Sequence, residues 1–263
     1  MNTMMKAGIV CLLIIPAEAY AFDKDPTNDE IDSGTNKLVS DEYCVASKTV
    51  SEYDMIQDMR LLSKEELRQA GLTDNDIMRI NQPLKARETY GKVTYTITFT
   101  DMYQKNGNTY LKTKATWSWS KAPTVLLTDV IAMTTSESFT KDSAACKINY
   151  YPNGDKNRAK TTYSGTVKTE DAGRGVFSRI SMGKDWDVAN HSYKRIAMSG
   201  YMTTTWSIGK KITQAGIASN YGHSIVGCTP SISIGKKTAS ISFTPEKKCK
   251  SGDEAYTKAT LTK

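Results

Sequence analysis

The sequence contains only two histidines, His191 and His223, and this scarcity restricts the chemistry open to it. No His-Glu-x-x-His pair occurs, so the ordinary zinc protease motif is missing. Neither histidine stands in a Gly-x-Ser-x-Gly or comparable setting, where it would serve as the base for a serine or cysteine nucleophile. A phosphate loop, a dinucleotide fingerprint and a Cys-x-x-Cys pair are also absent. We therefore expect no catalytic set, no metal and no cofactor.

Long apolar runs are equally scarce. The clearest one, Ala7 to Ile15, follows Lys6 and is far shorter than the roughly 20 residues needed to span a bilayer. Small residues at Ala19 and Ala21 complete the pattern of a secretory signal peptide. We expect cleavage after Ala21, a mature chain that begins at Phe22, and a secreted product.

Cysteine is rare, and its number agrees with export. Without the signal segment, four cysteines remain, and an even number in an exported chain predicts two disulfides with three possible connectivities. Cys228 and Cys249 bracket a hairpin-like segment and are the preferred pair, which leaves Cys44 to pair with Cys146. Reduced cysteines are the competing interpretation, because many exported proteins of Gram-positive bacteria avoid disulfides.

Charge is distributed unevenly along the chain. Residues 22–89 hold 9 Lys and Arg against 15 Asp and Glu, a net charge of −6, whereas residues 90–263 hold 25 against 12, a net charge of +13. A basic body behind an acidic leader favours attraction to polyanions, such as a cell-wall polymer, an anionic lipid or a glycan. The alternative is a body that uses Lys-rich strand faces for solubility and edge protection.

The segment Lys92 to Trp119 gives the strongest structural signal. Two arms of alternating apolar and polar residues flank Lys105-Asn106-Gly107, which is typical of a β-hairpin. A two-residue loop would bring the apolar face of one arm against the polar face of the other. The pattern therefore predicts a three-residue loop with Gly107 as a bulge, which places Tyr95 opposite Trp117 and Val93 opposite Trp119.

Helix signals are confined to the region before residue 90. Ser63 and Glu66 form a capping box, and Thr73 opens a second short helix that must stop before Pro83. Beyond this region, turn clusters separate short runs rich in Thr, Ser, Ile, Val and Tyr, a pattern typical of an antiparallel β-sandwich or barrel. We expect a mainly β fold preceded by a short helical hairpin. The expected organisation is a signal peptide at 1–21, an acidic leader at 22–60, the helical hairpin at 61–89 and the β domain at 90–263.

Two local clusters are candidate binding residues. Tyr221 and His223 flank a glycine that permits close backbone approach, although a histidine at a strand end that satisfies a loop carbonyl is the more common arrangement. Asp185 and Asp187 flank Trp186, an arrangement like that of a sugar-binding site, in which a ring stacks on the sugar and polar groups bind its hydroxyls. A polar turn around one buried tryptophan is the ordinary alternative.

Three motifs in order resemble a family. They are the helical segment from Leu62 to Ile77, the sequence Trp-Ser-Trp-Ser-Lys-Ala-Pro from Trp117 to Pro123, and Tyr-Gly-His followed by Pro-Ser-Ile-Ser between Tyr221 and Ser233. This combination is similar to that of uncharacterised exported β-rich proteins of Gram-positive bacteria. The resemblance covers most of the mature chain and implies no activity.

The sequence therefore favours an exported, non-enzymatic β domain that binds a surface or partner, with an anionic cell-surface polymer or a membrane surface as the expected partner and no nucleic acid. A membrane-acting, pore-forming-like β-protein is the first alternative, because Thr128 to Thr140 and Ile196 to Ile208 alternate partially, like strands that insert as amphipathic hairpins. A secreted hydrolase that uses His223, or Asp185 and Asp187, is the second.

Overall fold

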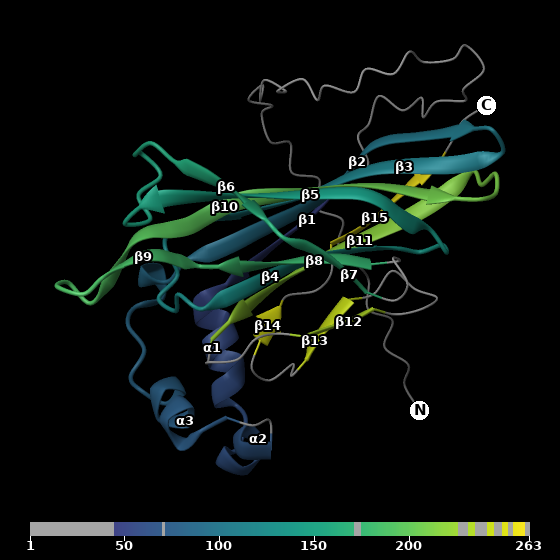
Figure 1. Ribbon diagram of the computed structural model, residues 1–263. Helices are drawn as coiled ribbons and strands as arrows, with labels where there is room; N and C mark the ends of the chain where they lie inside the picture. The colour runs from purple at the N-terminus through teal and green to yellow at the C-terminus, as the bar shows by residue number, and fades with distance from the viewer. Residues whose placement is uncertain are drawn as a thin grey trace, which may run out of the picture. The chain divides into compact units, whose positions relative to one another are not determined.

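The computed structural model describes residues 45–69, 72–170, 175–225, 231–234, 241–244, 249–251 and 255–260. In this part of the chain the structure is mainly β, and every strand pair is antiparallel. Two main sheets pack as a sandwich and do not close into a barrel (Figure 1). The predicted mainly β fold class is confirmed, and of its two predicted forms, sandwich or barrel, it is the sandwich.

The larger sheet, called sheet A, has the strand order β1-β2-β3-β10-β5-β6, and β9 pairs with the first part of β10. Its strands are β1 (Val45–Ser51), β2 (Lys92–Lys105), β3 (Asn108–Trp119), β5 (Thr140–Pro152), β6 (Thr161–Gly165), β9 (Gly183–Asp187) and β10 (Ser192–Ile208). The central strand β10 pairs with β3 on one side and with β5 on the other.

The smaller sheet, called sheet B, has the order β14-β11-β4-β8-β7, and β15 pairs with the first part of β11. Its strands are β4 (Thr128–Thr135), β7 (Val167–Glu170), β8 (Gly175–Ser181), β11 (Gln214–Ser224), β14 (Cys249–Ser251) and β15 (Ala255–Thr260). A separate pair joins β12 (Ser231–Ile234) to β13 (Ile241–Thr244).

The β2–β3 hairpin confirms the predicted facing pairs, because Val93 lies opposite Trp119 and Tyr95 opposite Trp117. The predicted loop is wrong. Lys105 pairs with Asn108, so the loop holds two residues, and both have positive φ, 52° at Asn106 and 83° at Gly107. The register is instead corrected within β2, by a bulge between Phe99 and Asp101.

The core between the sheets is built on aromatic side chains of sheet A. Trp117, Trp119 and Trp206 are all essentially inaccessible to solvent. The Trp117 indole lies over Gly200 of β10, where a Cβ would stand 2.2 Å from its Cη2 atom. Sheet B contributes aliphatic side chains such as Ile131 to the same cluster.

Two of the connections that pass from one sheet to the other are only one residue long. The first leaves β6 of sheet A through Thr166 and continues as β7 of sheet B. The second leaves β8 of sheet B through Met182 and continues as β9 of sheet A. The backbone of Met182 fixes this crossing, because its N–H donates to Leu127 before β4 (2.8 Å) and its carbonyl accepts from Ala197 of β10 (2.9 Å). The β9–β10 hairpin reaches beyond the ends of β4 and β8 (Figure 1).

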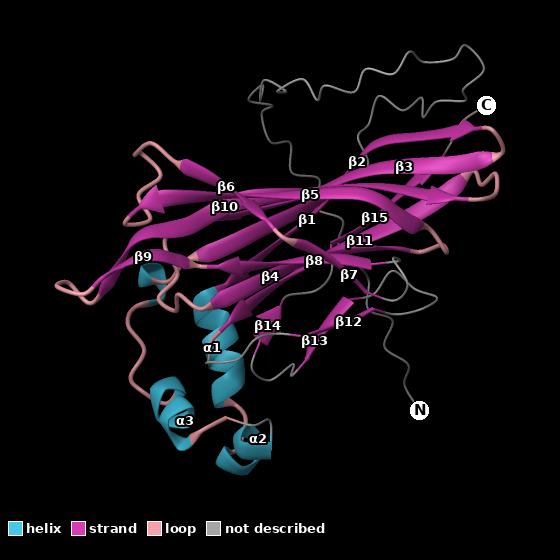
Figure 2. Cartoon of the chain, viewed as in Figure 1, coloured by secondary structure: helices cyan, strands magenta, loops and turns pink. Residues whose placement is uncertain are grey.

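Within the described residues, three short helices precede β2 (Figure 2): α1 (Glu52–Arg60), α2 (Lys64–Gln69) and α3 (Asp74–Ile80), followed by the 3-10 turn Arg87–Thr89. The predicted capping box at Ser63 is present, and α3 begins at the predicted place with a second capping box. Glu66 N–H donates to Ser63 Oγ (3.2 Å) while the Glu66 carboxylate accepts from Ser63 N–H (2.8 Å), and Thr73 and Asp76 repeat the arrangement at α3.

The sequence predicts an acidic leader at residues 22–60, and its last part, from residue 45, forms β1 and α1. In the structure β1 pairs with β2 along its length, and α1 buries Met55, Ile56 and Met59 in the core. Residues 45–60 thus supply an edge strand and an apolar helix face to the sandwich.

The predicted disulfides have different outcomes. Cys146 of β5 is a free, buried thiol, so the expected bridge to Cys44 is not formed in the structure. Its Sγ packs against Gly165 of β6, and burial raises its pKa. Cys44 and Cys228 lie outside the described residues, as does the side chain of Cys249. The Cys228–Cys249 bridge thus stays a prediction. The hairpin between them is present, with Ile232 opposite Phe243.

Candidate functional site

The five candidate binding residues fall into two separate places. Tyr221 and His223 lie in β11, and both are fully buried in the sandwich. Asp185, Trp186 and Asp187 lie together in β9, where Trp186 keeps 52% of its surface exposed. The two groups are therefore two separate sites, one buried and one exposed.

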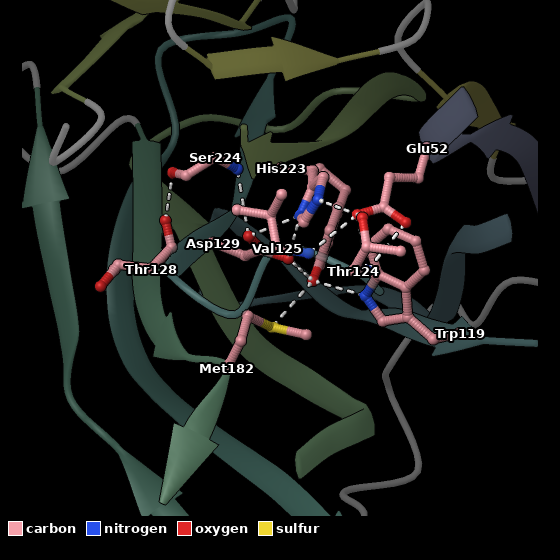
Figure 3. A network of polar contacts seen from close by, with 10 residues as sticks. Glu52, Trp119, Thr124, Val125, Thr128, Asp129, Met182, His223 and Ser224 are labelled. Atoms are coloured by element: carbon pink, nitrogen blue, oxygen red, sulfur yellow. Dashed lines mark hydrogen bonds and ion pairs between the residues drawn. The ribbon is translucent and has the colours of Figure 1, made fainter. Parts of the chain in front are cut away.

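The buried group is centred on Asp129 of β4 (Figure 3). Its carboxylate accepts hydrogen bonds from Tyr221 Oη (2.6 Å) and from Ser224 N–H (3.1 Å). Nδ1 of His223 lies 2.9 and 3.0 Å from its two oxygens. Trp119 Nε1 donates in turn to Tyr221 Oη (3.1 Å), which ties β3 of sheet A to β4 and β11 of sheet B.

A second buried carboxylate, Glu52, stands on the other side of the imidazole. Its Oε1 lies 3.4 Å from His223 Nε2, and neither side chain is accessible to solvent. Glu52 also accepts from the backbone N–H of Thr124 (2.8 and 2.9 Å), from Thr124 Oγ1 (2.8 Å) and from Val125 N–H (3.0 Å). Because Glu52 is the first residue of α1, this contact joins the helix to β11 and to the connection before β4.

The electrostatics of this group define its role. Burial alone would lower the pKa of His223, but the charges of Asp129 and Glu52 outweigh it and raise the pKa to about 10. Burial raises the pKa of Glu52, but its contacts with His223 and Thr124 prevail and lower it. The imidazolium is thus protonated at neutral pH and sealed from solvent. His223 therefore offers little free base for hydrolysis there, and the charged groups beside it are carboxylates, not the loop carbonyl expected from sequence.

The exposed group extends into an aromatic platform, formed by Tyr163 of β6, Lys184 and Trp186 of β9, and Tyr193 and Arg195 of β10. Trp186 pairs with Tyr193, and Lys184 pairs with Arg195. The rings of Trp186 and Tyr193 meet edge to face with centroids 4.9 Å apart. Gly183 makes room for this pair, since a Cβ there would lie 2.3 Å from the Tyr193 ring.

The cations of the platform gather around Tyr163. The Lys184 ammonium stands 3.8 Å from the centroid of its ring, close enough for a strong cation–π contact. The guanidinium of Arg195 lies 5.9 Å from the same centroid, and its Nη1 donates to Tyr163 Oη (2.9 Å). Tyr163 lies opposite the buried Ile148, so its ring is on the face of sheet A that further along packs against sheet B.

Asp185 and Asp187 shape the hairpin and do not form an acid–base pair. Asp185 has φ of 56°, a left-handed conformation that costs a residue other than glycine roughly 1–3 kcal/mol, and its carboxylate pairs with Arg195 Nε at 2.5 Å. Asp187 accepts from Ala189 N–H (3.1 Å) and Asn190 Nδ2 (2.9 Å). These hydrogen bonds, Asn190 first, hold the pKa of Asp187 below its usual value.

Further positive charge lies beside the platform. The β5–β6 connection, residues 153–160, is joined to it by the hydrogen bond from Asn153 N–H to the carbonyl of Lys194 (2.9 Å). Together with β9 and the start of β10, this end of sheet A carries six basic side chains against three carboxylates, a net charge of +3. The basic residues are Lys156, Arg158, Lys160, Lys184, Lys194 and Arg195, and the acidic ones are Asp155, Asp185 and Asp187.

The sequence marks the triplet Asp185-Trp186-Asp187 as a candidate site, but it does not mark Lys184, Tyr163 or Arg195. Lys184 directly precedes the triplet, and only the strand pairing shows that its neighbours are aromatic. Glu52 and Asp129 were not predicted either, because no sequence pattern around them indicates that they contact a histidine far along the chain.

Comparisons with known proteins give only distant structural similarity. No protein-family model matches the chain, and no protein with a curated description matches its sequence. The collagen-binding domain of a Staphylococcus aureus adhesin is similar at a TM-score of 0.31 and 7% identity, over 57% of this chain and 87% of that domain. The KRT10-binding region domain of the pneumococcal serine-rich repeat protein gives 0.28 and 8%, over 83% and 100%. Clostridium perfringens delta-toxin gives 0.23 and 7%, over 87% and 93%. At such scores nothing about function is transferred to this chain.

Among the helices of the described residues, none is both long enough and apolar enough to cross a bilayer.

Proposed function

We propose that the chain is an exported, non-enzymatic binding domain that attaches to an anionic polymer of a cell surface through the aromatic platform. The observation that carries this proposal is the exposed Trp186 within a cluster whose basic side chains outnumber its acidic ones by six to three. All four tryptophans lie in the described residues, and the other three are 0–1% exposed. An indole left half in solvent beside an excess of cations is a typical contact surface for an anionic partner.

A polymer fits this surface better than an anionic bilayer does. Asp185 and Asp187 lie in the same short strand as Trp186, so a uniformly negative membrane would meet two carboxylates on the hairpin that carries the indole. A chain molecule can place its charges against the cations alone. Lys184 supports this, because among the described residues its ammonium contacts aromatic rings and no carboxylate.

Insertion of strands into a membrane is not favoured by the sheet topology. Thr128 to Thr140 contains β4, which pairs with both β8 and β11, and Ile196 to Ile208 lies within β10, which pairs with both β3 and β5. Release of either segment would break two ladders of backbone hydrogen bonds and expose the core. The hydrolase alternative also loses its base, because His223 is buried as a cation.

The test is retention of the purified chain on beads that carry dextran sulfate, across a salt series. We expect retention at low salt that weakens steeply as salt rises, since exposed charges are screened beyond about 8 Å at physiological ionic strength. Lys184→Ala should reduce retention. Lys105→Ala is the matched control, because it removes one exposed lysine at the β2–β3 loop outside the platform. No retention at any salt, or equal losses in the two variants, would refute the proposal.

A further inference from the structure

We infer that the platform contains two subsites, one for an acid group at Lys184 and one for a sugar ring at Trp186, and that the ligand is an acidic glycan. This inference rests on the proposed function and narrows its partner to polymers in which a ring and an acid group occur in the same unit.

The acid subsite is defined by three side chains around one ring. Tyr163 Oη accepts from Arg195, which leaves its own hydroxyl hydrogen for an incoming oxygen. The Lys184 ammonium rests on the Tyr163 ring and keeps its remaining N–H groups for a ligand. Asp185 neutralises Arg195, so the subsite has a net charge of about +1, which suits a single carboxylate or sulfate group.

The ring subsite is the exposed part of Trp186. The indole is held by its edge-to-face contact with Tyr193, so its exposed surface is fixed in orientation before a ligand arrives. At the tip of the same hairpin the Asp187 carboxylate accepts from Asn190 Nδ2 (2.9 Å), so polar groups suited to sugar hydroxyls lie on the hairpin that carries the indole.

The spacing of the two subsites follows from strand geometry. Lys184 and Trp186 are two residues apart in β9, and their partners Arg195 and Tyr193 keep the same separation in β10. Two residues of a regular strand span roughly 7 Å, and the left-handed backbone at Asp185 makes this an upper bound for the two subsites. One sugar ring and its own acid substituent cover a comparable length, whereas a polymer with charges and no rings would leave Trp186 without a contact.

The experiment uses three probes that separate charge from ring. Polygalacturonate carries both, its methyl ester carries rings without charge, and polyphosphate carries charge without rings. Tryptophan emission reports the ring subsite, because Trp186 is exposed and the other three tryptophans are buried. We expect polygalacturonate to change the emission and the methyl ester to bind at least tenfold more weakly. Polyphosphate should bind without any change in emission.

Two variants complete the test, with bead retention as the readout. Trp186→Ala should weaken polygalacturonate binding roughly tenfold, which corresponds to the loss of one aromatic contact, and leave polyphosphate binding unchanged. Lys184→Ala should weaken both. Equal binding of the ester and the acid, or unchanged emission with polygalacturonate, would overturn the two subsites while polyphosphate binding still supports the proposed function. Failure of all three probes would refute both.

Discussion

Glu52, the first residue of α1, lies 3.4 Å from His223 of β11, and both side chains are completely buried. Asp129 holds the other side of the same imidazole at 2.9 Å. One cation between two carboxylates thus connects the helical segment, sheet B and, through Tyr221 and Trp119, sheet A. Removal of one partner of such a group leaves the others charged and unsatisfied, which is far more costly than the loss of an exposed ion pair.

His223→Phe should therefore lower the free energy of unfolding by about 3–5 kcal/mol, because two buried carboxylates would lose their cation. Urea denaturation followed by tryptophan emission measures this. His191→Asn is the matched control, since His191 is exposed and has a positive φ of 46° that asparagine tolerates. The control should stay within about 0.5 kcal/mol of the native protein. A loss below about 1 kcal/mol for His223→Phe would show that the buried cation is not structural.

Stability should depend on pH through the same group. The pKa of His223 is raised to about 10 in the folded protein, whereas an unfolded histidine titrates near 6.5. Its contribution is complete below pH 6.5 and is lost as the pH rises toward 10, because folding then requires uptake of a proton. The urea midpoint of the native protein should fall between pH 7 and 10 by more than that of His223→Phe. If the urea midpoints of the two proteins fell by the same amount over this pH range, the raised pKa of His223 would be contradicted.

The contribution of Glu52 to stability depends on pH in the opposite direction, and this dependence lies in the acid range. Its pKa is lowered in the folded protein, so its contribution is present above the ordinary value of 4.5 and is lost as the pH falls below it. Glu52→Gln should flatten the acid limb of the stability curve. Glu65→Gln, an exposed substitution in α2, is the control and should leave that limb unchanged. Equal acid limbs in Glu52→Gln and the native protein would contradict the assignment.

Gly200→Ala should destabilise the protein by about 3 kcal/mol or more, because the new methyl group would stand 2.2 Å from the Trp117 indole and 2.4 Å from the carbonyl of Lys147. Neither the indole nor the backbone has space to move within the sandwich. Gly209→Ala is the control, since no atom lies within 4 Å of its Cβ position. Thermal unfolding of both variants decides the matter, and equal melting temperatures would contradict the packing described.

Much of the fold was predictable because strand alternation is a local property. The pairs Val93–Trp119 and Tyr95–Trp117 follow from the alternation of apolar residues, and the helix starts follow from Ser63 and Thr73. The loop length was not predictable, because a bulge elsewhere in β2 corrects the register equally well. Helix α1 could not be separated from the predicted leader, because what holds it is the burial of Met55 and Met59 in the core, which the local sequence does not show.

The candidate site was only partly predictable for the same reason. The triplet around Trp186 is contiguous in sequence, so its polar and aromatic character could be noticed. Tyr163 and Arg195 belong to other strands, and only pairing and sheet curvature bring them beside Lys184. Tyr221 and His223 drew notice for their composition, but their burial depends on Asp129 and Glu52, and no local pattern shows those contacts.

Lysine acetylation followed by mass spectrometry, with and without dextran sulfate, tests whether the aromatic platform binds an anionic polymer. We expect Lys184 of the platform and Lys194 beside it to be acetylated more slowly when the polymer is present, whereas exposed Lys64 and Lys105, outside this basic end of sheet A, react at the same rate in both samples. If the polymer slowed the acetylation of Lys105 but not that of Lys184, or slowed all four lysines equally, binding through the platform would be contradicted.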